Sequence, residues 1–157
     1  MVKNTIAEFH GTIKITSIRK LKITQHGCED GDKFQGFKGE FFILGDYSFS
    51  ENKEQNHSGI FNGAFRSDFF LDKNNKVRYD DIEFCSDGYT NNQFVGQWQS
   101  YNGSLTKRCN WGDFRIPNSG DFDIGAGEFS PSKYIENGWQ NIKKEQQLSN
   151  AEYKWWK

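Results

Sequence analysis

The chain has 157 residues, of which 34% are hydrophobic and 17% are aromatic, and its formal net charge is −1. This length suits a single domain with a core of its own. The near-neutral charge excludes the basic surface that nucleic-acid binding requires. Only two prolines and sixteen glycines also exclude a disordered or collagen-like chain. Because half of the hydrophobic share is aromatic, aromatic side chains must supply much of the core.

The N-terminal residues lack the apolar region of a secretion signal, and no stretch is apolar enough for a membrane span. Three cysteines, Cys28, Cys85 and Cys109, form no Cys-x-x-Cys pair. One disulfide with one free thiol is possible, but three reduced thiols are more typical of a cytoplasmic protein. We therefore expect a cytoplasmic protein with no membrane partner.

Glycine recurs in one setting, with an aromatic residue two positions before it and a large residue two positions after it. On a strand these three positions share one face. The glycines are 28, 24 and 33 residues apart, so we expect equivalent strand bends at them; chance recurrence is the alternative. The four units are Phe9-His-Gly11-Thr-Ile13, Phe37-Lys-Gly39-Glu-Phe41, Phe61-Asn-Gly63-Ala-Phe65 and Phe94-Val-Gly96-Gln-Trp98.

Further strands and turns follow in chain order. Phe9, Gly11, Ile13 and Ile15 alternate with polar residues, which predicts a strand. Polar composition predicts long loops over residues 25–33, 46–57 and 86–93. Residues 72–76 form a turn cluster between two predicted strands.

The last part of the chain contains a hairpin signal and a helix signal. The pair Asn102-Gly103 is favoured in type I′ hairpin turns. Ser130 and Ser132 are candidate N-caps, and the helical spacing of Ile135, Trp139 and Ile142 predicts a short C-terminal helix.

We predict an all-β fold, a single up-and-down antiparallel β-barrel with a short C-terminal helix; a β-sandwich is the alternative. Four units of two strands amount to about eight to ten strands, and so wide a sheet must curl or close. We expect residues 1–130 to form the barrel and residues 131–157 to form a helix and tail packed on it.

Repeated Phe-x-Gly-x-aromatic strands resemble those of calycin-type barrels, namely lipocalins, fatty-acid-binding proteins and avidins. Gly96-Gln-Trp98 followed by Tyr101-Asn-Gly-Ser104 is locally similar to the opening strand and turn of avidins. The resemblance implies a barrel that holds a small ligand in its lumen or mouth. In such a barrel we expect ligand contacts from Phe41, Phe65, Trp98, Trp111 and Arg115.

The stretch from Trp111 to Glu128 combines acidic residues with glycines. A hairpin turning at residues 118–120 would keep its apolar side chains on one face and pair Arg115 with Asp123. Two alternatives are a calcium site and an acid/base pair. The weak candidates for a metal are Asp121, Asp123 and Glu128, although we expect no metal and no cofactor.

Three function classes follow. The leading one is a non-enzymatic barrel that binds a small apolar or planar ligand. The alternative is a protein-interaction module, such as an inhibitor or immunity-type partner, whose barrel is filled by its aromatic residues. The outlier is a hydrolase or isomerase that uses residues 113–128.

The adjacent residues Trp155 and Trp156 expose a large apolar area if they lie in water. They are candidates for an interface with another subunit or with a partner protein. The alternative is that one of them caps an open end of the barrel.

Overall fold

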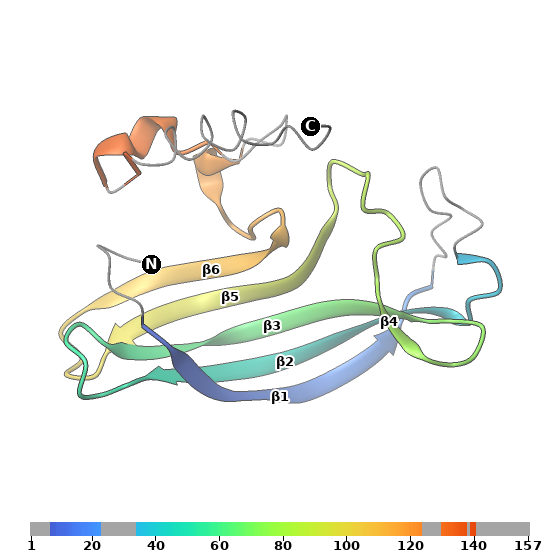
Figure 1. The fold of residues 1–157 in the computed structure, drawn as a ribbon, viewed down its shortest axis with the longest axis horizontal. Coiled ribbons are helices and arrows are strands. Elements are labelled where there is room, and N and C mark those ends of the chain that lie inside the picture. Colours follow the sequence, from blue (N-terminus) through green and yellow to red (C-terminus); the bar gives the residue numbers. More distant parts are fainter. Residues whose placement is uncertain (1–6, 23–33, 124–129, 138, 141–157) are drawn as a thin grey trace, which may run out of the picture. The chain divides into compact units, whose positions relative to one another are not determined.

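The computed structural model describes residues 7–22, 34–123, 130–137 and 139–140. The chain divides into two units, Met1–Ser119 and Gly120–Lys157. The first contains one six-stranded sheet (Figure 1). Its strands are β1 (Phe9–Lys20), β2 (Gly39–Glu51), β3 (Gly59–Leu71), β4 (Val77–Tyr79), β5 (Thr90–Ser100) and β6 (Thr106–Phe114).

All strand pairs are antiparallel, which confirms the predicted all-β antiparallel class. The sheet order is β1-β2-β3-β5-β6, and the short β4 pairs with β3 off this path. Within the described residues, β1 and β6 remain the two edges and the sheet does not close. The predicted closure into a barrel of more strands is therefore not confirmed.

The first strand begins where the alternating pattern predicts it. Phe9 lies opposite Glu51, and the register continues to Ile15 opposite Gly45. A register shift between Ile15 and Ser17 then adds one residue to β1. Because side chains alternate along a strand, this bulge brings Ile18 to the same face as Ile15.

Two of the repeated glycines lie directly opposite each other. Gly63 of β3 faces Gly96 of β5, and the Tyr47 side chain lies where either glycine would carry a Cβ. Gly11 also lies inside a strand. Gly39 differs, because it is the first residue of β2 and has a φ of 135°, so the prediction that it is equivalent to Gly63 and Gly96 is wrong.

The hairpins predicted at residues 72–76 and 102–103 are present. Residues 72–76 connect β3 to β4, and Asp72 and Lys76 share a backbone hydrogen bond. β5 and β6 are joined by residues 101–105, with only Gly103 at positive φ among them, so this loop is not the predicted two-residue type I′ turn. The loop predicted over 46–57 is confirmed for residues 52–57 and wrong for residues 46–51, because β2 continues to Glu51.

A small core lies at one end of the sheet. Phe34, Phe70 and Ile82 are buried together, and Phe37 packs against them. Phe34 and Phe70 meet edge to face with ring centroids 5.6 Å apart. This core anchors the segment between β4 and β5, which also contains the disulfide-bonded Cys85.

The expectation of three reduced thiols is therefore wrong for Cys85, whereas Cys109 is a free thiol. Disulfides are rare in cytosolic proteins. No helix among the described residues is long and apolar enough to cross a membrane.

The second unit contains two short 3-10 helices, Gly120–Phe122 and Ser132–Asn137. Phe122 stacks on Tyr134 with ring centroids 4.6 Å apart. The hairpin predicted to turn at residues 118–120 is wrong, because β6 ends at Phe114 and a 3-10 helix follows the turn. The start of the predicted C-terminal helix corresponds to the 3-10 helix Ser132–Asn137, whereas Ile142 and the tail over residues 141–157 lie outside the described residues.

Candidate functional site

The two faces of the sheet differ sharply in composition. Registers and strand alternation place large aromatic side chains from every long strand on one face, which we call the aromatic face. The opposite face, which we call the polar face, carries mainly amides, hydroxyls and charges. The aromatic face comprises Phe9, Phe41, Tyr47, Phe49, Phe61, Phe65, Phe69, Phe94, Trp98 and Trp111, with Ile13, Ile15, Ile18 and Ile43.

Tyr47 lies at the centre of this face and is 2% exposed. Its ring meets Phe94 and Trp111 edge to face, at centroid distances of 5.3 and 5.2 Å. Phe94 also stacks on Trp111 at 4.7 Å. These spacings lie in the favourable range for aromatic pairs, so the central rings fill the space between one another.

The structure brings together four of the five residues predicted to contact a ligand. Phe41, Phe65, Trp98 and Trp111 all lie on the aromatic face. Arg115 does not, because it follows β6 and its Nε donates to the carbonyl of Asp87.

A buried carboxylate lies at one end of the aromatic face. Glu51 is 8% exposed, and its Oε2 accepts hydrogen bonds from the Gly59 N–H and the Trp98 Nε1–H, each 2.8 Å long. The Tyr101 hydroxyl donates to the Glu51 carbonyl. The bonds from Gly59 and Trp98 compensate for removing the carboxylate from water, and all three bonds join the ends of β2, β3 and β5.

Two titratable groups lie near the centre of the aromatic face. Burial, followed by the charge of Cys109, raises the pKa of Tyr47 to about 12. Burial, followed by the charge of Glu51, raises the pKa of the Cys109 thiol. The Tyr47 hydroxyl is buried and has no hydrogen-bond partner among the described residues. Both groups are therefore neutral near pH 7, and the thiol is a poor nucleophile.

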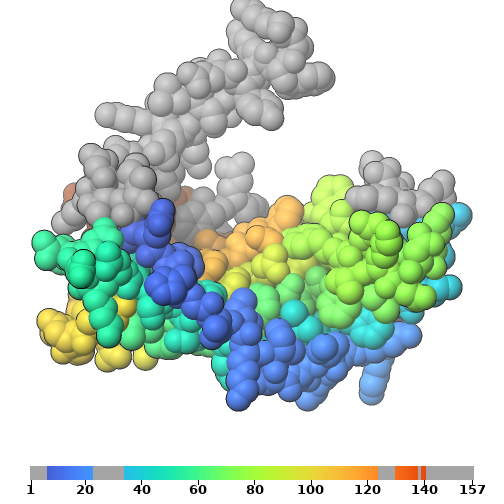
Figure 2. Space-filling model, turned by 60° about the horizontal axis from the view of Figure 1, so that its bottom comes forward, coloured from blue at the N-terminus to red at the C-terminus, as the bar shows by residue number. Residues whose placement is uncertain are grey.

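The aromatic face continues into an exposed row on the edge strand. The row, which we call the β1 apolar row, contains Phe9, Ile13, Ile15 and Ile18, which are 50%, 37%, 46% and 63% exposed. Phe9 packs on Phe49 and Phe61 at centroid distances of 5.3 and 5.4 Å. The row is therefore a direct extension of the ring cluster. Figure 2 shows the side chains of β1, in blue, without other coloured elements over them.

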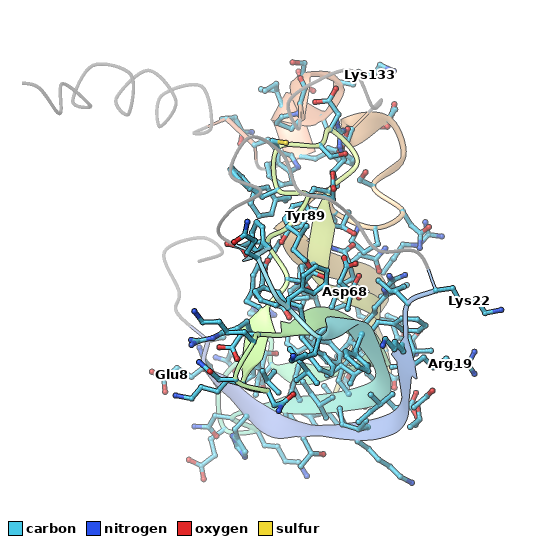
Figure 3. The ribbon with its side chains drawn as sticks, turned by 90° about the vertical axis from the view of Figure 1, so that its right-hand side faces the viewer. Glu8, Arg19, Lys22, Asp68, Tyr89 and Lys133 are labelled. Atoms are coloured by element: carbon cyan, nitrogen blue, oxygen red, sulfur yellow. The ribbon has the colours of Figure 1, made fainter. Side chains whose placement is uncertain are left out.

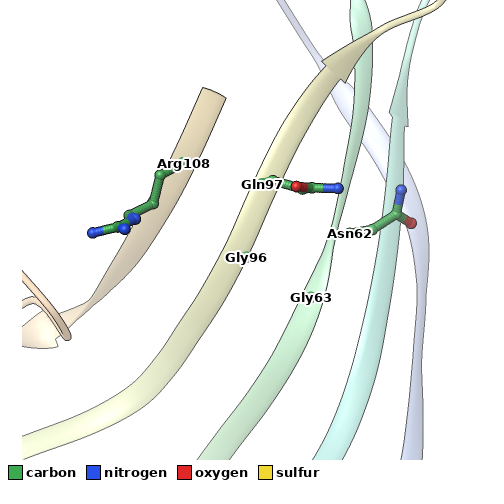
Figure 4. A pocket seen from close by; sticks show the side chains of 5 residues that line it. All are labelled: Asn62, Gly63, Gly96, Gln97 and Arg108. Carbon is green, nitrogen blue, oxygen red and sulfur yellow. The ribbon is translucent and has the colours of Figure 1, made fainter. Parts of the chain in front are cut away.

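The polar face contains a shallow hollow at the paired glycines. Asn62, Gln97 and Arg108 lie in register on β3, β5 and β6 and line it together with Gly63 and Gly96. Figure 4 shows that Arg108 points away from the other two side chains. The three polar groups therefore do not converge on one ligand atom.

A polar network lies at the end of the sheet opposite Glu51, and sequence patterns did not reveal it. Asn91, which is 1% exposed, accepts from the Asp68 N–H and donates to the Asp68 and Asp80 carbonyls. Tyr89 donates to the Asp80 carbonyl. Figure 3 labels Asp68 and Tyr89 in this region. A lone asparagine in a strand gives no sequence signal of such a role.

Burial raises the pKa of the Asp80 carboxyl, and the Ile82 N–H opposes this shift. Tyr79 and Asn92 both donate to Asp113. The network satisfies backbone groups where β5 leaves its regular register between Asn91 and Phe94, so its evident role is structural.

The acidic stretch does not assemble a metal site within the described residues. Asp121 accepts from the Tyr134 hydroxyl and pairs with Lys133 at 3.0 Å. These two partners lower the pKa of the Asp121 carboxyl. Glu128, Trp155 and Trp156 lie outside the described residues.

No protein-family model, no curated protein and no solved structure matches this chain.

Proposed function

We propose that this protein is a non-enzymatic interaction module that binds a partner protein through the β1 apolar row. The observation that supports this proposal is the exposure of four large apolar side chains along one edge strand. Single exposed apolar residues are ordinary. Here they follow one another on the same face, and contiguous apolar patches mark interaction sites.

The interlocked rings of the aromatic face also favour this function. Phe65 lies 4.7 Å from Phe94, as Trp111 does, so side chains occupy the space that a ligand would need. The rings instead form a rigid platform beside the row, and rigid aromatic surfaces suit protein partners. An inhibitor or immunity-type protein is the kind of module that works in this way.

A peptide library displayed on phage tests the proposal. We expect peptides that bind the unmodified protein and lose binding to Ile15→Lys, because lysine places a charge in the middle of the row. Val77→Lys is the matched control, since Val77 is 67% exposed on β4, away from the row. Failure to enrich any peptide, or equal binding to Ile15→Lys, would contradict the proposal.

A second candidate function is small-ligand binding at the aromatic face, as in a calycin-type barrel. The buried Tyr47 hydroxyl favours it, since it has no hydrogen-bond partner in the described part of the chain and a ligand that donates or accepts there would satisfy it. Titration with the apolar dye anilinonaphthalene sulfonate tests it. Saturable binding that Trp111→Leu weakens would support this candidate, and a lack of saturation would exclude it.

A further inference from the structure

We infer that β1 receives an additional antiparallel strand from the partner protein, and that this strand alternates apolar and acidic residues. The inference rests on the proposed function and adds the chemistry of the partner. It combines a backbone edge that pairs with no other strand among the described residues, an apolar row on one face of β1, and Lys14 and Arg19 on the other face.

The outer backbone edge of β1 can accept a further strand. In an antiparallel ladder, alternate residues direct their N–H and C=O groups to the same neighbour. Because β1 pairs only with β2 among the described strands, the remaining groups point outward. All of β1 except Ser17 is exposed, and the strand contains no proline. A long edge of this kind is a template for strand addition.

The bulge limits where a strand can dock. The register shift between Ile15 and Ser17 interrupts the regular ladder. The segment Phe9–Ile15 before it is uninterrupted, with Ile13 and Ile15 on the aromatic face and Lys14 between them on the polar face. A partner strand therefore pairs with Phe9–Ile15.

The opposite edge is less suited to this role. β6 has nine residues, against twelve in β1. Its residues from Cys109 to Asp113 are half-buried, and Asn110 donates to the carbonyl of Pro117, so the following chain returns to this strand.

Charge then specifies the partner. β1 contains His10, Lys14, Arg19 and Lys20 and no acidic residue. Within the described chain neither Lys14 nor Arg19 forms an ion pair, although Asp46 lies opposite Lys14. Figure 3 shows Arg19 pointing away from the sheet. Of these cations, Lys14 lies within the docking segment Phe9–Ile15, and an acidic residue opposite it gains a favourable cross-strand pair.

A second copy of this chain fits less well. If the Phe9–Ile15 segments of two copies paired antiparallel, Lys14 of each copy would face His10 of the other, so Lys14 would gain no carboxylate partner. An acidic strand from another protein provides the opposite charge that a second copy does not. The protein as a whole is slightly acidic, so the positive edge is a local feature suited to a different, acidic chain.

Fluorescence anisotropy with synthetic peptides tests the inference. The probe is a labelled peptide of alternating valine and glutamate, and its control has lysine in place of glutamate. We expect the glutamate peptide to bind the unmodified protein about tenfold more tightly than the lysine peptide. Lys14→Glu should reverse this preference, and added salt should weaken it.

A third peptide, N-methylated on alternate valines, lacks the donors that strand pairing needs. We expect it to lose binding by about tenfold or more. Equal binding of the methylated and unmethylated peptides would overturn strand addition. If both peptides bound equally and Ile15→Lys abolished their binding, the β1 apolar row would remain the interaction surface, but the partner would not pair with β1 as a strand. If no valine–glutamate peptide bound, the inference would fail while the library result still decided the proposed function.

Sedimentation of the unmodified protein at the assay concentrations tests whether a second copy of this chain occupies the edge of β1. A monomer agrees with an external partner. A dimer that the glutamate peptide dissociates would overturn the inference, because a second copy would then be the natural occupant of the edge.

Discussion

Gly63 and Gly96 lie directly opposite each other on β3 and β5, and the Tyr47 side chain covers both. The contact requires the absence of a Cβ at either position. The central ring of the aromatic face therefore reaches its place only because two strands lack side chains beneath it.

Gly96→Val should lower the free energy of unfolding by about 2 kcal/mol or more. A Cβ there would overlap the Asn62 carbonyl and the Tyr47 hydroxyl, and the backbone group cannot move aside cheaply. Urea unfolding measures the change. Gly88→Val is the control, since a Cβ at Gly88 would meet only the Ser86 hydroxyl at 4.0 Å; equal effects at the two sites would contradict this explanation.

Glu51→Ala should destabilise the protein by about 3 kcal/mol, because it leaves the Gly59 and Trp98 donors without their charged acceptor. Trp98→Phe should cost less in the Glu51→Ala background than in the unmodified protein, with a coupling of about 1 kcal/mol. A double-mutant cycle in urea measures this. Strict additivity would mean that the indole–carboxylate bond contributes nothing.

Tyr47 should make stability fall with pH at the alkaline end. Its pKa is raised from 10.0 to about 12 in the folded protein, so the unfolded chain loses this proton first. The stabilisation is complete below pH 10.0 and disappears as the pH rises to about 12.

Thermal unfolding of the unmodified protein and of Tyr47→Phe across that range isolates this contribution. We expect the stability of Tyr47→Phe relative to the unmodified protein to increase with pH, because phenylalanine does not ionise. Parallel curves would show that Tyr47 ionises equally in both states.

Asn91→Ala should lower the free energy of unfolding by about 2 kcal/mol or more, since it leaves backbone groups of Asp68 and Asp80 unsatisfied in a buried place. Asn62→Ala serves as the control, because Asn62 is exposed in the middle of a strand and such changes usually stay within about 0.5 kcal/mol. Circular dichroism during chemical unfolding distinguishes the two variants.

Strand alternation predicted the aromatic face well. Phe61, Phe65 and Trp98 share one face because their spacing has the period of a strand, and the register keeps their neighbours with them. The polar composition of residues 46–57 concealed the second half of β2. There the polar Asp46 and Ser48 are only the exposed side of a strand whose other side contains Tyr47 and Phe49.

Other features have no local sequence signal. The bulge after Ile15 depends on how β2 is matched to β1, and the role of Asn91 depends on segments more than twenty positions away. Charge balance and turn preference predicted a hairpin that pairs Arg115 with Asp123. These local signals do not decide whether a strand follows the turn, and the structure has a 3-10 helix there. The exposure of β1 also depends on which strand becomes the edge.

The strand order has a consequence for synthesis. β1, β2 and β3 pair in the order in which they leave the ribosome, and β5 and β6 then extend the sheet on the side away from β1. None of the later described strands pairs with the outer edge of β1. A nascent chain presents this edge before its own sheet is complete, so early capture by an acidic partner would also protect it from pairing with unrelated strands.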